Sequence, residues 1–171
     1  MGRSFTANAA LQIHPGSGPR LAFTPLPLAN LGANLRVEVA TASALVNDPN
    51  SPLARQSLVI MAHIDTGASQ TTIASSLAQH LALTQTGVGV ANTANGAMTS
   101  PTYAADITFV GTDLKARSDL NIGSCKLPFD LQRHAAQPND PRNFGILIGR
   151  DIMSAWHIVW DGPSSTIMIY D

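Results

Sequence analysis

One aspartate on a tight turn is the feature of this sequence best suited to chemistry. Asp65 opens the small-residue stretch Asp-Thr-Gly-Ala-Ser and follows the apolar run 58–64. Such a turn holds a carboxylate at the surface of a core, while the small residues let another backbone segment approach closely. Acid–base chemistry needs one proton donor and one acceptor. The Asp-Thr-Gly triplet occurs once in 171 residues, so if Asp65 is catalytic, the second carboxylate must come from another copy of the chain.

Two other chemistries have less support. His63 and Asp65 lie two residues apart, hence on one face of a strand, but no further His or Asp cluster completes a metal site. Cys125 with His134 suggests a thiol nucleophile, but nothing around them indicates an activated thiol. We therefore expect no metal and no cofactor, and interpret Cys125 as a small packed residue.

The elements that must position Asp65 are predicted to be mainly strands. Apolar and polar residues alternate over 35–39, as in a strand with one wet face, and the run 58–64 indicates a buried strand. After the turn, apolar residues recur at four-residue spacing over 73–81, which predicts a short helix ending near Leu83.

A long hairpin is predicted next. The pair Asn95-Gly96 lies between the segments 88–90 and 97–110, and Asn-Gly is a strong hairpin-turn signal.

Further reversals are predicted along the following segment. Turn residues at 111–113 and 121–123 separate predicted strands at 114–120 and 124–131, and the polar segment 137–143 is predicted to be a loop. The pattern up to this point indicates a β meander.

The last part of the chain combines apolar runs with one short helix. Residues 151–156 read as one or two helical turns, with Asp151 as N-cap. Strands are predicted at 157–160 and 166–170. The terminal apolar strand needs a partner edge, which another subunit could provide.

The N-terminal residues are expected to form an extension. Segments 11–14 and 20–23 flank a Pro- and Gly-containing stretch and predict a hairpin. We therefore expect an extension over 1–32, packed on the core, and one domain over 33–171.

Composition fits a turn-rich β protein. Hydrophobic residues make up 44% of the chain and charged residues only 12%, with 13 glycines and 11 prolines. A formal charge of −1 without a basic run argues against a nucleic-acid partner. No apolar stretch is long enough for a signal peptide or a membrane span, so we expect a cytoplasmic protein.

Three motifs in order resemble the retropepsin-like aspartic proteases, the single-lobe homodimeric relatives of pepsin. They are the Asp65 turn after its apolar strand, the glycine-bearing hairpin at 92–96, and Leu-Ile-Gly-Arg-Asp at 147–151 before a short helix. The hairpin is most similar to that of bacterial members. The resemblance covers about 33–171 and implies an all-β, closed β-barrel-like acid protease fold with one or two short helices.

The resemblance also implies a mechanism. Asp65 of each of two subunits would form the catalytic pair, with Gly67 completing the triplet and Thr66 locking the two turns together. Two carboxylates at hydrogen-bond distance cannot both ionise cheaply, so they share one proton. The charged member would activate a water that attacks the peptide bond, without metal or covalent intermediate. The implied activity is that of a homodimeric aspartic endopeptidase.

By the same resemblance, the hairpin around Asn95-Gly96 would be a flap that closes over an extended peptide. The uncharged candidate walls favour apolar side chains on both sides of the scissile bond. Substrate contacts are expected from Ser69, Asn95, Gly96, Met98 and Ile148.

One departure and one alternative accompany this interpretation. Viral members carry an acidic residue where this chain has Ser69, so Arg150 lacks its usual partner and we leave its partner open. The alternative is a catalytically silent retropepsin-like module for dimerisation or peptide binding, against which the intact triplet argues. The natural substrate, the cleavage specificity, the pH optimum and processing from a longer precursor are not determined by the sequence.

Overall fold

The computed structural model describes residues 32–47, 53–93, 96–161 and 166–171. The strands are β1 (Asn34–Thr41), β2 (Ser57–Ile64), β3 (Thr72–Ala74), β4 (Gln85–Thr93), β5 (Gly96–Phe109), β6 (Arg117–Cys125), β7 (Phe144–Ile148), β8 (His157–Asp161) and β9 (Thr166–Tyr170). The helices are α2 (Ser43–Val46), α3 (Ser75–His80), α4 (Leu131–Ala136) and α5 (Arg150–Met153).

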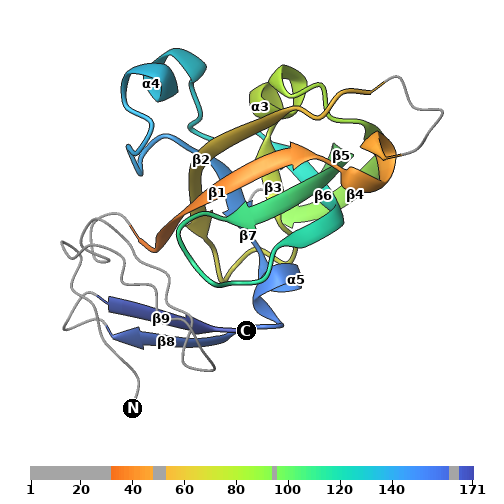
Figure 1. Ribbon diagram of the computed structural model, residues 1–171. Helices are drawn as coiled ribbons and strands as arrows, with labels where there is room; N and C mark the ends of the chain where they lie inside the picture. The colour runs from red at the N-terminus through yellow and green to blue at the C-terminus, as the bar shows by residue number, and fades with distance from the viewer. Residues whose placement is uncertain (1–31, 48–52, 94–95, 162–165) are drawn as a thin grey trace.

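Six of the strands form a closed barrel (Figure 1). The sheet order is β1-β2-β7-β3-β6-β5-β4, and β1 also pairs with β5, which closes the sheet on itself and leaves β4 outside the ring. Both edges of β1 are used, because it pairs with β2 over 34–40 and with β5 over 37–41. The predicted all-β, barrel-like fold is confirmed. The described residues form four short helices, more than the one or two expected.

The alternating pattern of β1 places its apolar side chains inside the barrel. Leu35, Val37 and Val39 are at most 2% exposed, whereas Arg36 between them is exposed. Each such buried side chain contributes about 1.5–3 kcal/mol by removal from water. The fully buried large side chains that join them in the core include Ile60, Ile73, Leu77, Ile107, Phe109, Ile122 and Ile146.

The predicted reversal at 121–123 is wrong. These residues lie inside the single strand β6, where Gly123 pairs with Thr102 on one side and with Thr72 on the other. A side chain would be tolerated here, because a Cβ at Gly123 would make only an ordinary contact, at 3.5 Å, with the Thr72 methyl carbon. The predicted strand over 124–131 therefore ends early, at Cys125.

The predicted helix over 73–81 begins later than expected. Ile73 and Ala74 belong to β3, which pairs in parallel with β6 and antiparallel with β7, and only residues 75–80 are helical. The apolar spacing remains informative, because Leu77 and Leu81 are buried against the same core as Ile73. Sheet pairing overrides the helical pattern at its start.

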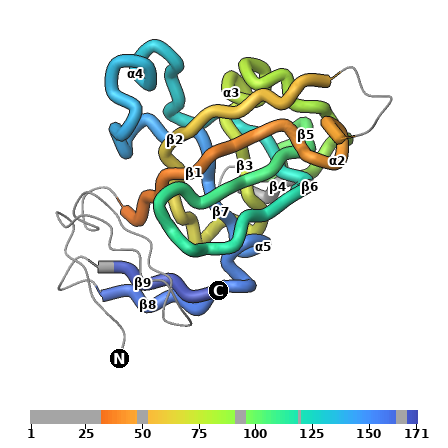
Figure 2. Tube along the Cα trace, in the orientation of Figure 1, coloured from red at the N-terminus to blue at the C-terminus, as the bar shows by residue number. Residues whose placement is uncertain are grey.

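The chain between β6 and β7 leaves the barrel and forms a lobe that contains α4 (Figure 2). The sequence analysis missed this helix, although Asp130 is a normal N-cap whose carboxylate accepts a hydrogen bond from the Arg133 amide at 2.7 Å. It also missed α2. The loop predicted at 137–143 is confirmed.

The C-terminal strands form a separate two-stranded sheet, drawn beneath the barrel and joined to it through α5 (Figure 1). The partner edge of the terminal strand β9 is therefore β8 of the same chain, with Ile158 opposite Ile169 and Trp160 opposite Ile167. Ile167 and Ile169 are buried in the hydrophobic core, whereas Trp160 is 48% exposed.

Some expectations fall outside the described residues. They are the N-terminal hairpin within 11–23 and the first residue of the Asn95-Gly96 turn. The division of the chain at residue 32 therefore stays a prediction. In the part of the chain that the structure describes, no helix is long and apolar enough to cross a membrane.

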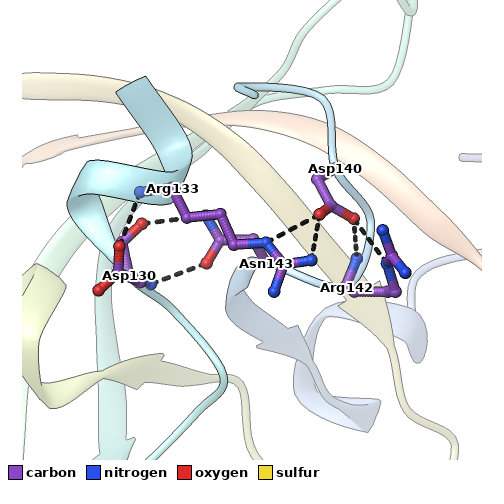
Figure 3. Close-up of polar contacts among 5 residues, drawn as sticks. All are labelled: Asp130, Arg133, Asp140, Arg142 and Asn143. Atoms are coloured by element: carbon purple, nitrogen blue, oxygen red, sulfur yellow. Dashed lines mark hydrogen bonds and ion pairs between the residues drawn. The ribbon is translucent and has the colours of Figure 1, made fainter. Parts of the chain in front are cut away.

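A buried carboxylate holds the α4 lobe together (Figure 3). Asp140 is 5% exposed and accepts hydrogen bonds from the Arg142 amide at 3.0 Å and from the Arg133 and Arg142 guanidinium groups. The Asn143 side chain accepts from the Asp130 amide at 2.7 Å and donates to the Asp130 carbonyl, which joins the two ends of the lobe. Burial alone would raise the pKa of Asp140, but these hydrogen bonds and the arginine charges lower it to about 2.

This cluster predicts a pH-dependent contribution to stability. Because the pKa of Asp140 is lower in the folded state, its stabilising effect is present above pH of about 4 and is lost as the pH falls towards 2. Asp140→Asn should lower the melting temperature by several degrees at pH 6, and by much less near pH 2. Glu38→Gln on β1 is the control, and the difference between its melting temperature and that of the wild type should not shrink between pH 6 and pH 2. An equal deficit for Asp140→Asn at both pH values would contradict this assignment.

Candidate active site

Asp65 follows β2 at the end of the barrel where β2 runs parallel to β7. Ile64 and Ile148 are paired, and the Asp65 amide donates to the Ile148 carbonyl at 3.0 Å, which anchors the start of the turn 65–71 (hereafter the Asp65 turn). The Gly67 amide donates to Asp65 Oδ1 at 2.8 Å. Asp65 is partly exposed, and its Oδ2 accepts no hydrogen bond from the described residues. One oxygen is therefore oriented and the other is available.

Arg150 supports this turn from the start of α5. Its amide donates to the Ala68 carbonyl at 3.0 Å, and its Nη1 donates to the Thr66 carbonyl at 3.0 Å. The partner that the sequence left open for Arg150 is thus a backbone carbonyl and not a carboxylate. No sequence signal identifies such a partner, because any residue presents a carbonyl.

Asp151 holds the far end of the turn and is not an N-cap as predicted. Gly149 occupies the N-cap position of α5, while the Asp151 carboxylate accepts from the Thr71 amide at 2.9 Å and from the Thr71 hydroxyl at 2.7 Å. The Thr71 hydroxyl in turn accepts from the Gly149 amide at 3.1 Å. Asp151 therefore links α5 to the Asp65 turn instead of starting the helix.

Gly149 allows this close approach. A Cβ at this position would lie 2.4 Å from the carbonyl carbon of Gln70 and 2.7 Å from the Thr71 nitrogen. Both atoms belong to the backbone and cannot rotate away. The turn and the segment 148–151 can lie this close only with glycine at 149.

His63 packs beside the Asp65 turn. Its ring stacks on Phe144 at a centroid distance of 5.2 Å, and its Nδ1 lies 3.1 Å from the Asn34 side-chain oxygen. Burial lowers the pKa of His63, and the Asp65 charge partly opposes that shift. These contacts give His63 packing partners. Among the described residues, no group of three or more His, Cys, Asp or Glu side chains is placed to hold a metal ion.

The hairpin of β4 and β5 projects beyond the barrel ring and has two different faces. Val88 and Val90 lie opposite Pro101 and Thr99, so these four share one face. Along β5 that same face continues to Ala105, Ile107 and Phe109, which line the barrel interior. Val88 and Val90 are nevertheless 63% and 71% exposed, because the barrel does not extend beneath them.

The chain matches the family model described as Aspartyl protease over residues 42–118, a segment that contains both the Asp65 turn and the β4–β5 hairpin. Over this segment the chain is similar to the aspartyl proteases, in agreement with the resemblance carried by the three motifs. No curated protein matches the chain significantly.

Two solved structures are similar to this chain. One is a retropepsin-like aspartic protease from Rickettsia conorii, at 16% identity and a TM-score of 0.45, covering 88% of this chain and 89% of that one. The other is a protein of unknown function from Legionella pneumophila, at 17% identity and a TM-score of 0.32, covering 69% of this chain and 83% of that one.

The structure places the remaining predicted site residues of this chain in different surroundings. Thr66, Gly67 and Ser69 are exposed on the Asp65 turn. Gly96 begins β5 with a positive φ of 108°, and Asn95 lies outside the described residues.

The two predicted apolar walls differ from expectation. Met98 is 43% exposed, but it pairs with Ala91 and lies on the hairpin face opposite Val88 and Val90. Ile148 is 0% exposed, and its side chain belongs to the barrel core of this chain. The sequence analysis missed Val88 and Val90, although their two-residue spacing on a hairpin strand signals a shared face.

The packing of the Asp65 turn predicts that Gly149→Ala is severely disruptive. The added methyl group has no space against the backbone of Gln70 and Thr71, so the turn or α5 must move. We expect a loss of at least about 2–3 kcal/mol in the free energy of unfolding by urea. Gly123→Ala is the matched control, since its methyl group would make only ordinary contacts from 3.5 Å outward. Equal stability of the two variants would contradict the close approach described above.

Proposed function

We propose that this protein is an aspartic endopeptidase that acts as a homodimer, with one Asp65 from each subunit. The observation that carries the proposal is the state of the Asp65 carboxylate, with Oδ1 fixed by the Gly67 amide and Oδ2 free of partners in the described chain. A carboxylate oriented by the backbone and left open on one side is suited to bind a water or a second carboxylate.

The single triplet supports the need for two copies. One Asp65 cannot act as base and acid at once, whereas two at hydrogen-bond distance share a single proton and divide these roles. The ionised member accepts a proton from the bound water, which attacks the peptide carbonyl. The protonated member donates a hydrogen bond to the oxygen on which negative charge develops.

Thr66 supports a contact between the two turns. Its side chain is exposed, and its hydroxyl makes no hydrogen bond to the described residues. A hydroxyl can donate one hydrogen bond and accept others, so two facing copies of Thr66 can satisfy each other. We propose that this contact brings the two Asp65 turns together.

The β4–β5 hairpin is proposed as the flap that covers an extended peptide. Val88 and Val90 present apolar surface on the face that continues into the barrel interior, which is the face proposed to lie against the substrate. Burial of these side chains against a peptide would be favourable by about 1–2 kcal/mol each. This supports a preference for apolar substrate side chains, with Val88 and Val90 in place of Met98 and Ile148 as walls.

The proposal predicts that activity requires Asp65 and an assembled dimer. Asp65→Asn should abolish cleavage of a peptide library at mildly acid pH, because the pair loses a proton-sharing carboxylate on each side. Solution mass measured under assay conditions should be twice that of the chain. Glu38→Gln is the charge-matched control and should keep full activity. Unchanged turnover in Asp65→Asn, or activity of a monomer, would contradict the proposal.

The alternative is a silent binding module. It would be favoured if the wild-type dimer bound extended peptides without cleaving them and Asp65→Ala bound them equally well.

The two faces of the hairpin predict different effects on substrate use. Val88→Ser and Val90→Ser should each lower kcat/KM for a peptide with apolar side chains about 5–30-fold, through the lost burial. Met98→Ser on the opposite face is the control and should change kcat/KM less than about twofold. The reverse order of effects would show that the other face of the hairpin covers the substrate.

A further inference from the structure

One peptide group connects the Arg150 side chain to Asp65. The Arg150 guanidinium donates to the carbonyl oxygen of the Thr66–Gly67 peptide at 3.0 Å, and the N–H of that same peptide donates to Asp65 Oδ1 at 2.8 Å. A planar trans peptide holds its C=O and N–H in opposite directions. Fixing the oxygen therefore fixes the direction in which the N–H points.

The two hydrogen bonds also strengthen each other. A cation at the carbonyl oxygen polarises the amide and makes its N–H a better donor, an effect of roughly 10–30% per bond in such chains. The stronger donor favours the charged form of the acceptor carboxylate.

Among the described residues, the Arg150 guanidinium makes no ion pair with a carboxylate. The adjacent Asp151 accepts instead from Thr71 and from the Ile152 amide. The guanidinium lies exposed, and the Thr66 carbonyl is the acceptor that its side chain contacts.

We propose that Arg150 is a positioning residue for the Asp65 pair, acting through the Thr66–Gly67 peptide. This inference rests on the proposed function, since it assigns Arg150 a role in that reaction. Arg150 does not touch the substrate. It sets the orientation of the Asp65 carboxylate, which accepts the proton from water.

The kinetic test compares Arg150→Met, which removes the donor and the charge at similar length, with Arg150→Lys, which keeps one cationic donor. Arg150→Met should lower kcat about tenfold with little change in KM, as expected for one charge-assisted contact. Arg150→Lys should recover most of the loss in kcat. Arg36→Met, at an exposed arginine on β1, is the control and should match the wild type.

A second readout does not depend on turnover. The Gly67 amide proton resonance should report its hydrogen bond to Asp65 Oδ1, and in Arg150→Met this resonance should move upfield, because the weaker donor makes a longer hydrogen bond. When Asp65 is already replaced by Ala, the further substitution Arg150→Met should change the Gly67 resonance much less.

The possible outcomes separate this inference from the proposed function. An unchanged kcat in Arg150→Met, with an unchanged Gly67 resonance, overturns the positioning role. Loss of activity that is restored by raising the protein concentration, with a monomeric mass at low concentration, also overturns it, because Arg150 would then act on assembly. A wild-type dimer without turnover contradicts the proposed function, while the Gly67 resonance still decides whether Arg150 acts on Asp65.

Discussion

The docking of the segment 148–151 against the Asp65 turn is the constraint on which the site depends. Every residue of this segment makes a hydrogen bond to the turn, through the Ile148 carbonyl, the Gly149 amide, the Arg150 amide and guanidinium, and the Asp151 carboxylate. The contact joins positions about eighty residues apart in sequence. It requires a glycine, because a methyl group at Gly149 would overlap the Gln70 backbone. A short turn of small residues has few side-chain contacts of its own, so its geometry must be imposed from outside.

Barrel closure makes this docking possible. Pairing of β1 with both β2 and β5 closes the ring and keeps β2 fixed beside β7, so the ends of these two parallel strands meet. The α4 lobe is stabilised separately, by the buried Asp140 between two arginines, and it precedes β7 directly. The same barrel provides one face of the β4–β5 hairpin with an apolar continuation. The strands that carry the Asp65 turn and those of the β4–β5 hairpin therefore belong to the same seven-stranded sheet.

The proposed chemistry depends on the fixed orientation of the Asp65 carboxylate. A catalytic carboxylate pair needs its oxygens aligned before the substrate arrives, because alignment achieved in advance costs nothing during the reaction. Here the Gly67 amide aligns one oxygen of Asp65, and Arg150 acts on the carbonyl of the same peptide. The acidic residue that viral relatives carry at position 69 is a serine in this chain. Arg150 therefore supports the turn through a backbone acceptor. Its guanidinium donates to the carbonyl of the Thr66–Gly67 peptide, next to Asp65.

The resemblance to the aspartyl proteases, the barrel-type fold, the Asp65 turn and the long hairpin could be predicted from the sequence, because local signals mark them: an apolar run, a small-residue triplet and an Asn-Gly pair. It failed where distant strands decide the outcome. Ile73 joined β3 and Gly123 stayed inside β6, since pairing on both edges outweighed local helix and turn signals. Only the tertiary structure showed the Thr66 carbonyl as the partner of Arg150, the Asp151 link to Thr71, and the outward exposure of Val88 and Val90. Backbone acceptors and strand faces carry no residue-type signature, so they become visible only when the chain has closed on itself.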